Sequence, residues 1–415
     1  MISKRLLIYC LLPLFLACGN TETATTTDSY ATSITLKNPL DNSRKDVLLH
    51  LNVKELITKF PSLLAGNFKF TGTQDLPFQE NDLDGDGITD EIALLVDLKA
   101  NDEQQINLVP LKEGATKPTF KKRTQAEISH KINGQWKGRE YEDGTFKNVD
   151  QLRVPPEHTD HSWFIRYEGP GWESDLVGYR FYLDWRNATD IFGKKTKDMV
   201  LQQVGQDGFD SYHEPADWGM DVLKVGKSLG IGALGTWTDK GALRVETTDS
   251  LASKIVLNGD IESKVQTNYY GWKVGDIKTD VTSNLSIHAG SRLTKHDITL
   301  SQALPNLCTG IVQHDKGDLI TYENGAWGYI ATWGKQSLAD DHLGMAVIYK
   351  KNDVVEITKD AHSHVVVLKP TNKQLTYYFL AAWEQEPNAI QTKEAFVNYL
   401  NQVVLEFGMP LAVSF

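Results

Sequence analysis

The sequence predicts a mainly β protein made of antiparallel β-sandwiches, and three observations support this prediction. From Ile34 onward, short segments of alternating apolar and polar residues are separated by clusters of Gly, Asn, Asp and Pro, a pattern typical of strands and turns. The 415 residues include 32 glycines, which suits a fold with many turns. A hydrophobic fraction of 40% with 23% charged residues is typical of a globular chain with its own core.

One segment predicts a helix instead. From Thr392 to Phe407, apolar residues recur at three- and four-residue steps, which places them on one helical stripe. Thr392 can cap the first turn, and Glu394 complements the positive end of the helix dipole. We expect this C-terminal helix to pack on the outside of a sheet.

The chain is predicted to comprise a signal peptide, a lipidated tether, a small β domain with an Asp-rich loop, and a large β-sandwich that carries the active site. These parts span residues 1–17, 18–30, 31–118 and 119–415, respectively. The boundary between the two domains falls in a stretch rich in Lys and Arg, from Lys112 to Arg123.

The N-terminal residues predict a lipid anchor. Lys4 and Arg5 precede an apolar run, from Leu6 to Ala17, that is too short to cross a bilayer as a helix and is typical of a signal peptide. The run ends beside Cys18 in a sequence that resembles the cleavage box of bacterial lipoproteins, so Cys18 is the expected lipid anchor. We therefore expect a protein of the periplasm or cell surface that is held on the outer membrane by this anchor only. An ordinary secretory signal is the alternative.

The charge of the chain excludes one class of partner. The sequence has 43 Lys and Arg against 54 Asp and Glu, a formal net charge of −11. Nucleic acids are bound through a broad positive field, which this composition lacks, so no nucleic-acid partner is expected. A smaller anionic ligand would need cations gathered in one place.

An acidic loop predicts a structural calcium site. Asp82, Asp84, Asp86 and Asp90 occupy relative positions 1, 3, 5 and 9, and Ile88 at position 7 would offer its backbone carbonyl. Ca²⁺ prefers six to eight oxygen ligands, and this spacing wraps carboxylates around one point. An acidic β-turn without metal is the alternative. No organic cofactor is expected.

Residues 161–187 mix aromatic and charged side chains more densely than the rest of the chain. The segment predicts a strand, a loop and a second strand, and the pleat of the second strand, which includes residues 179–186, sends one set of side chains to the core and another to the opposite face. The first set is Tyr179, Phe181, Leu183 and Trp185, and the second is Arg180, Tyr182, Asp184 and Arg186. The second face predicts a wall for an anionic sugar, because two guanidiniums can fork onto carboxylate or sulfate oxygens. An exposed sheet face with ion pairs is the alternative.

Further candidates extend this site. Arg166 and Trp172 in the same segment, and Trp218 downstream, are candidate substrate-binding residues, although either tryptophan could belong to the core. His213 lies with Trp218 and Lys224 in a loop-like cluster, and loops on a rigid sheet often carry catalytic groups. Histidine has an unperturbed pKa near neutral pH, which suits acid/base catalysis. A hydrogen-bonded loop histidine is the alternative.

A family resemblance rests on these segments. The residues that carry it are Tyr167–Asp175 (YEGPGWESD), Gly178–Asn187 (GYRFYLDWRN), Asp190–Lys194 (DIFGK), His213, Asp217–Asp221 (DWGMD), Lys224 and the Asp-Gly-Asp-Gly loop. In them the chain resembles bacterial surface and periplasmic lipoproteins of the family called domain of unknown function 4861. The resemblance implies a role in degrading uronate-containing polysaccharides. In one branch it implies dehydration of the glucuronic or iduronic acid at the non-reducing end of ulvan oligosaccharides, giving a 4,5-unsaturated uronate.

The implied reaction needs a cation, an acid and a base, and the candidate residues can be assigned to these roles. Neutralising the substrate carboxylate is expected of Arg180, helped by Arg186 or Lys224. The expected acid and base are His213 and Tyr182, with His161 as the substitute. An acidic oligosaccharide is the expected partner, together with other enzymes of the same degradation pathway.

Two other functions remain open at the level of sequence. A non-catalytic glycan-binding lipoprotein would need only aromatic residues and arginines. A glycoside hydrolase would need a pair of carboxylates, for which the sequence offers Glu168, Glu173, Asp175 and Asp184. For the large domain, a loose analogy with the sandwiches of sugar mutarotases and polysaccharide lyases adds little about function.

Overall fold

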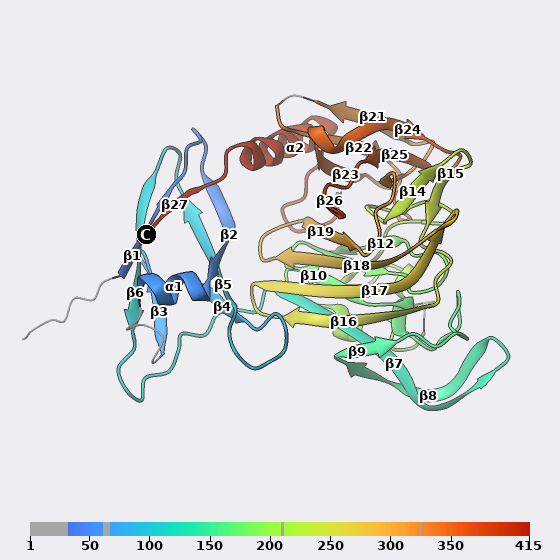
Figure 1. Cartoon of the computed structure of the whole chain (residues 1–415), viewed down its shortest axis with the longest axis horizontal. Coiled ribbons are helices and arrows are strands. Elements are labelled where there is room, and N and C mark those ends of the chain that lie inside the picture. Colours follow the sequence, from blue (N-terminus) through green and yellow to red (C-terminus); the bar gives the residue numbers. More distant parts are fainter. Residues whose placement is uncertain (1–31, 61–66, 209–210, 324) are drawn as a thin grey trace, which may run out of the picture. The chain divides into compact units, whose positions relative to one another are not determined.

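The computed structural model describes residues 32–60, 67–208, 211–323 and 325–415 (Figure 1). The expected signal peptide, tether and anchor Cys18 lie outside these residues. The described chain is mainly β, as predicted, and its strands form five sheets in which neighbouring strands run antiparallel.

Two of these sheets contain the first strands of the described chain. Their orders are β27-β1-β6-β3 and β2-β5-β4, and they enclose a common apolar core. Helix α1 (Val53–Lys59) begins where the side chain of Asn52 accepts a hydrogen bond from the backbone of Glu55. The strands are β1 (Thr32–Lys37), β2 (Arg44–Asn52), β3 (Phe68–Thr71), β4 (Phe78–Asn81), β5 (Glu91–Leu98), β6 (Glu103–Pro110) and β27 (Ala412–Ser414). The strand at residues 412–414 thus joins a sheet otherwise made from residues 32–110.

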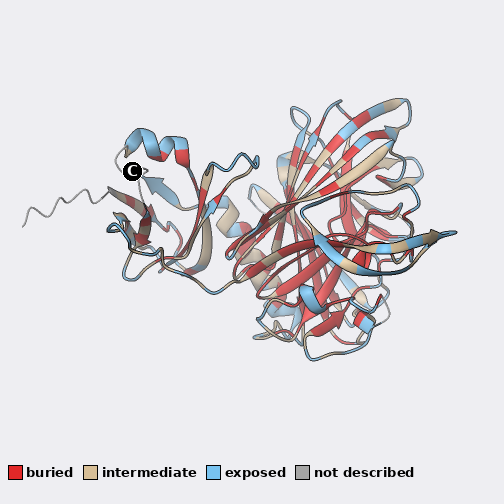
Figure 2. Cartoon of the chain, turned by 90° about the horizontal axis from the view of Figure 1, so that it is seen from below, coloured by how far each residue is buried: buried red, intermediate tan, exposed pale blue. Residues whose placement is uncertain are grey.

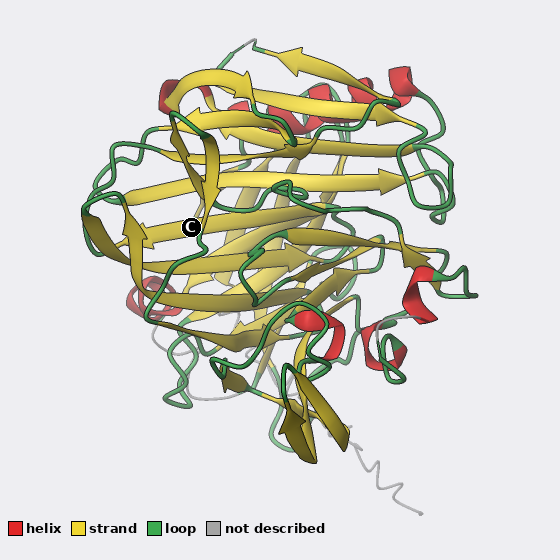
Figure 3. Ribbon diagram, turned by 90° about the vertical axis from the view of Figure 1, so that its right-hand side faces the viewer, coloured by secondary structure: helices red, strands yellow, loops and turns green. Residues whose placement is uncertain are grey.

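The other three sheets form the larger part of the fold, with orders β13-β12-β11-β10-β7-β8, β15-β14-β20-β25-β24 and β21-β22-β23-β26-β19-β18-β17-β16-β9 (Figure 3). The first comprises β7 (Thr124–Lys137), β8 (Glu140–Val149), β10 (Gly171–Ser174), β11 (Val177–Phe181), β12 (Thr189–Lys194) and β13 (Gly219–Asp221). The second comprises β14 (Gly235–Thr238), β15 (Gly241–Arg244), β20 (Leu307–Val312), β24 (Val354–Lys359) and β25 (Ser363–Leu368). The nine-stranded sheet comprises β9 (Gln151–Arg153), β16 (Ser250–Asn258), β17 (Glu262–Val274), β18 (Ile277–His288), β19 (Leu293–Leu300), β21 (Gly317–Tyr322), β22 (Trp327–Gly334), β23 (Leu343–Lys350) and β26 (Gln374–Trp383).

A single apolar cluster joins these three sheets into a sandwich-like core. Tyr179 of β11 packs against Phe379 of β26 and stacks on Trp172 of β10, and all three side chains are buried. Along β18, buried residues alternate with more exposed ones, as expected for a strand that covers a core with one face. Buried residues accordingly run through the strands of these sheets (Figure 2).

The predicted C-terminal helix is confirmed as α2 (Lys393–Gly408). The side chain of Thr392 accepts a hydrogen bond of 3.1 Å from the backbone of Ala395, which caps the helix as expected. Its apolar stripe packs with Tyr329 of β22, whereas the next residue, Ile330, belongs to the sandwich core. The helix therefore covers the outer face of the nine-stranded sheet. Of the helices in the described chain, none is long and apolar enough to cross a membrane.

The strand predicted to include residues 179–186 ends earlier in the structure. Strand β11 ends at Phe181, and the chain then turns through residues 184–187 before β12 begins. The carboxylate of Asp184 accepts the backbone N–H of Arg186 at 2.8 Å, which stabilises this turn. Trp185, predicted to face the core, is therefore 46% exposed.

Candidate active site

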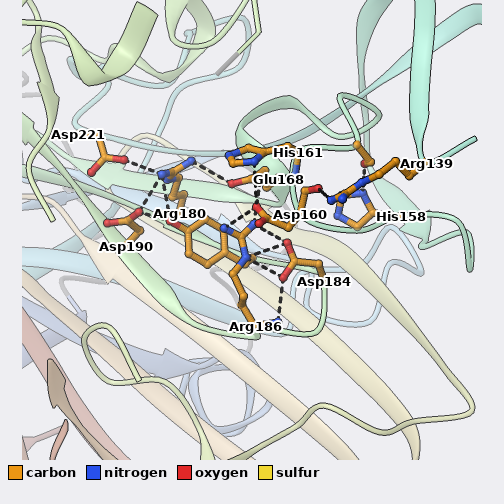
Figure 4. Close-up of polar contacts among 12 residues, drawn as sticks. Arg139, His158, Asp160, His161, Glu168, Arg180, Asp184, Arg186, Asp190 and Asp221 are labelled. Atoms are coloured by element: carbon orange, nitrogen blue, oxygen red, sulfur yellow. Dashed lines mark hydrogen bonds and ion pairs between the residues drawn. The ribbon is translucent and has the colours of Figure 1, made fainter. Parts of the chain in front are cut away.

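The centre of the candidate site is Arg180, which is only 2% exposed. Its Nη2 atom lies 2.8 Å from Oδ2 of Asp190 and 2.5 Å from Oδ2 of Asp221 (Figure 4). Its Nη1 atom donates to the Tyr212 hydroxyl at 2.6 Å. The sheet brings these groups together, because Arg180 of β11 pairs with Asp190 of β12, and β12 pairs with β13, which ends in Asp221.

A second arginine joins this network through Glu168. One oxygen of Glu168 lies 3.5 Å from Nη1 of Arg180, and the other accepts from Nη2 of Arg186 at 2.7 Å (Figure 4). Arg186 also pairs with Asp184 at 2.5 Å and with Asp160 at 3.0 Å. Carboxylates therefore outnumber guanidiniums around these two arginines.

The pKa values of two carboxyl groups in this network shift in opposite directions. Burial, reinforced by the neighbouring Asp190, raises the pKa of Asp221 well above its usual 3.8. Burial alone would also raise the pKa of Glu168, but the two nearby arginines lower it to about 2. Glu168 is thus held in the charged form, whereas Asp221 retains its proton at pH values where an ordinary aspartate has lost it. Such a split of pKa values between neighbouring carboxyls is typical of acid/base sites.

Two histidines stand where this buried network meets the solvent. The His213 side chain is 38% exposed, and its Nε2 atom lies 3.4 Å from Oδ2 of Asp221. The His161 side chain is 50% exposed, and its Nδ1 atom lies 3.5 Å from Oδ1 of Asp160. The backbone N–H of His161 also donates to Glu168 at 3.1 Å. Both imidazoles therefore adjoin a carboxyl group on one side and solvent on the other.

The backbone around this network adopts unusual conformations. His161, Trp163, Tyr167, Glu168 and Asn187 all have positive φ angles, of 56°, 63°, 39°, 70° and 38°. Residues with side chains rarely adopt such angles, and each costs on the order of 1–3 kcal/mol unless the surroundings enforce it. Strained residues of this kind gather at functional sites.

A small cleft opens beside Glu168, the carboxylate that both arginines contact. The space within and above it measures about 250 Å³, of which part is open solvent. Its walls are Phe146, His161, Trp163, Ile165, Tyr167, Glu168 and Gly208. Gly208 has a φ angle of 116°, and a Cβ atom there would lie 2.1 Å from the Trp163 ring, so this position requires glycine. Phe146 and Trp163 were not among the candidate residues. Trp163 lay within the dense aromatic segment, whereas Phe146 comes from another hairpin and carried no local signal.

Two of the predicted substrate contacts are buried in the structure. Arg166 is buried and pairs with Glu127, and its Nη1 atom donates to the backbone of Gln202. Trp172 is completely buried, and its Nε1 atom donates to Thr294 at 2.9 Å. Protein atoms enclose both side chains, so neither presents a face to a sugar.

Arg180 and Tyr182 are also buried in the structure. The guanidinium of Arg180 is enclosed and bound by protein carboxylates, so it is not available to clamp a substrate carboxylate. The Tyr182 hydroxyl is buried between Arg180 and Asp190, and burial raises its pKa well above 10. Both residues are placed to position other groups. Among the remaining candidates, Trp218 is half-buried against Phe192, and Lys224 is exposed.

The acidic loop brings carboxylates together as predicted. Oxygen atoms of Asp82, Asp84 and Asp86 lie within 4.8 Å of one another. Asp90 is turned to the start of the loop, where it accepts the backbone N–H of Leu83 at 2.9 Å, and the side chain of Ile88 is exposed. Backbone donors of Gly87 and Gly85 lower the pKa of Asp82, which keeps its carboxylate charged. The donor set suits a hard cation, and calcium binding stays a prediction.

Comparison with curated proteins gives no match. Among solved structures, the chain is similar to a protein in glycosyl hydrolase family 38 from Enterococcus faecalis, with 8% identity and a TM-score of 0.41 over 92% of this chain and 47% of the other. It is also similar to an alpha-mannosidase from Enterococcus faecalis V583, with 8% identity and a TM-score of 0.37 over 92% of this chain and 45% of the other. The chain spans about half the length of these structures. Residues 36–413 match the family described as Domain of unknown function (DUF4861), and the chain therefore belongs to this family.

Proposed function

We propose that the protein is a carbohydrate-active lyase that dehydrates the uronic acid at the non-reducing end of ulvan-type oligosaccharides. The observation that carries this proposal is the pair of half-exposed histidines, His161 and His213, each beside a carboxyl group of one buried network. A glycan-binding module would need no such arrangement. A lipid anchor at Cys18 would hold the enzyme on the outer membrane, close to the enzymes that release these oligosaccharides.

The reaction requires one proton acceptor and one proton donor. The base removes the proton at C5, and the electrons of that C–H bond form the C4=C5 double bond. The bond between C4 and its hydroxyl oxygen breaks, and the acid supplies the proton with which this hydroxyl leaves as water. The substrate loses one water, and the reaction consumes no oxidant, reductant or co-substrate.

His161 and His213 provide the acid and the base of this proposal. Each imidazole can exchange protons with solvent between turnovers, because each is partly exposed. Asp221, next to His213, is itself a proton-holding group, which lets that pair share the transferred proton. In this arrangement His161 takes the role first expected of Tyr182.

Removal of the C5 proton also requires the substrate carboxylate to be neutralised. Lys224 supplies this charge in our proposal, because it is exposed and follows Asp221 by three residues. Arg180 acts as a positioning residue that holds Asp190 and Asp221 in place. The carboxylates that a hydrolase would use are less suitable, since Glu173 pairs with Lys194 and Asp175 pairs with Arg123.

Product analysis tests this proposal directly. The full-length protein would be incubated with saturated uronate–rhamnose-sulfate oligosaccharides while ultraviolet absorbance and product mass are followed. We expect a new enol-ether chromophore and an intact oligosaccharide lighter by one water. Chain cleavage without the chromophore would instead identify a hydrolase. Binding without any chemical change would identify a glycan-binding module, and either result would overturn the proposal.

A further inference from the structure

We propose that the β7–β8 hairpin carries a subsite for an acidic group on the sugar next to the reacting uronate, with Lys131 as its cation. The acidic group is an oxyanion, either a sulfate ester or a second carboxylate. The proposal rests on the proposed function, because it takes the cleft lined by His161 as the place where the uronate binds.

The position of Lys131 follows from the pairing of the two strands. Lys131 of β7 lies directly opposite Phe146 of β8, and its Nζ atom is 5.7 Å from the centroid of the Phe146 ring. Phe146 lines the same cleft as His161 and Trp163. The ammonium group therefore stands beside one wall of that cleft.

The alternation of side chains along β7 agrees with this placement. Glu127 and Lys131 are four residues apart, so they lie on the same face of the strand. Glu127 accepts a hydrogen bond of 2.8 Å from the hydroxyl of Tyr167, which also lines the cleft. The face of β7 that carries Lys131 is thus the face turned to the candidate active site.

Lys131 also differs from two neighbouring cations, Lys137 and Arg166, in lacking an acidic partner among the described residues. Within the described residues no carboxylate pairs with it, and its Nζ atom contacts the backbone oxygen of Tyr141 at 3.5 Å. Lys137, farther along the hairpin, instead pairs with Glu142 at 3.1 Å, and Arg166 pairs with Glu127. A half-buried ammonium group without a counter-ion has most to gain from an anionic ligand.

The chemistry of the wall indicates what the ligand is. An aromatic ring such as Phe146 offers a flat apolar surface to a sugar ring, while Lys131 offers a compact positive charge to an oxyanion. A sugar bearing an acidic group satisfies both. We assign the reacting uronate to His161 and the sugar ring at Phe146 to its neighbour. The overall charge of −11 makes such a local cation necessary for an acidic chain to be held there.

Calorimetric binding experiments with the full-length protein test this proposal. The variants are Lys131→Ala and Lys131→Arg, with Lys137→Ala as the control on the same hairpin. The ligands are a sulfated uronate–rhamnose tetrasaccharide and its desulfated counterpart. We expect Lys131→Ala to weaken binding of the sulfated ligand about tenfold, and Lys131→Arg to weaken it much less. Lys137→Ala should bind as the wild type does, and thermal unfolding should show that all three variants are folded.

The outcomes separate the sources of the acidic group. If Lys131→Ala weakens only the sulfated ligand, the group is a sulfate, and if it weakens both ligands equally, the group is a carboxylate. If Lys131→Ala binds both ligands as the wild type does, the proposal is overturned. Binding is measured in proteins that also carry His213→Ala, which blocks the proposed turnover, and product formation is followed separately in the wild type. A loss of affinity caused by Lys131→Ala, together with no unsaturated product from the wild type, would retain the subsite while rejecting the lyase.

Discussion

Two centres of buried charge lie on the same face of one sheet, and they are built differently. Asp190 and Lys194 are four residues apart on β12, so their side chains point the same way. At Lys194, the ammonium group meets Glu173 at 2.5 Å, and both side chains are 0% exposed. Glu173 also accepts the backbone N–H groups of Val200 and Leu201. This centre has one cation for one carboxylate, and it is closed to solvent.

The centre at Arg180 has more carboxylates than cations, and it ends at the half-exposed His161 and His213. A balanced, closed pair can do little beyond fixing the loop that it binds. An unbalanced network retains protons that it can exchange through groups at its edge. Buried charge alone therefore does not mark an active site, and surplus acid that leads to an exposed titratable group is the feature on which our proposal for this site rests.

The largest effect is expected at the open end of the Arg180 network. His213→Ala should lower kcat/KM for dehydration by about 10²–10⁴-fold, because it removes one of the two proton-transfer groups. Steady-state kinetics would measure this loss. His314→Ala is the matched control, since His314 also lies beside a carboxylate, that of Asp315, but outside the network. If His213→Ala keeps full activity, the proposed role of this histidine is wrong.

Substitutions in the closed Lys194–Glu173 centre should change the free energy of unfolding and leave the catalytic rate unchanged. Lys194→Met should lower the free energy of unfolding by about 3–5 kcal/mol, because it leaves Glu173 buried without its cation. Adding Glu173→Gln should restore much of this loss, since glutamine can still accept the two backbone hydrogen bonds. Urea denaturation would measure both variants. Lys121→Met is the control, because its pair with Asp198 is exposed and should change stability by less than about 1 kcal/mol.

The two results together would test the contrast between the centres. Lys194→Met should keep its activity per folded molecule under conditions where it remains folded. A large loss of kcat in this variant, or recovery by Glu173→Gln of activity instead of stability, would mean that the closed pair also takes part in catalysis.

The raised pKa of Asp221 predicts a pH-dependent stability. The folded protein favours the protonated acid, so this contribution is complete below the usual pKa of 3.8, declines as the pH rises above it, and is gone above the raised pKa. Asp221→Asn imitates the protonated form at every pH. Its stability relative to the wild type should therefore increase as the pH rises through this window. Unfolding by urea across a pH series would measure the difference, and a difference independent of pH would contradict the assignment.

The smallest effect is expected at the Asp-rich loop. This loop is a third group of acids, in which Asp84 and Asp86 are exposed. At ten times its dissociation constant, Ca²⁺ should stabilise the fold by about 1.4 kcal/mol. Thermal unfolding with Ca²⁺ and with a chelator would measure this shift. Asp84→Asn should reduce it, whereas Asp143→Asn, at an exposed position on the β7–β8 hairpin, should not. Equal unfolding temperatures with and without Ca²⁺ would exclude the site.

The periodicity of apolar residues predicted secondary structure correctly where neighbouring residues alone determine it. The stripe from Thr392 to Phe407 gave α2, because a helix face repeats every three or four residues. Alternation failed after Phe181, where the Asp184 side chain favours a turn over a continued strand. Alternation of apolar and polar residues does not show where a strand ends. A polar side chain that hydrogen-bonds to nearby backbone groups can end the strand within an alternating pattern.

The candidate site was predicted in composition but not in arrangement. The dense segment did contain Glu168, Arg180 and Arg186, yet sequence could not show that their charges satisfy one another away from solvent. The sequence did not predict a role for Phe146 and Lys131, because strand pairing, not proximity in sequence, brings them to the cleft. Which side chains are exposed depends on contacts between distant segments, and these become visible only once the fold is known.

The position of β27 has a consequence for synthesis of the protein. Its residues pair with β1, so that Thr35 lies opposite Ser414 and Lys37 opposite Ala412. The ribosome makes β1 early and β27 more than 370 residues later. Throughout that interval one edge of β1 has unpaired backbone groups that another chain could bind. A nascent chain of this protein therefore depends on protection of that edge until residues 412–414 have been made.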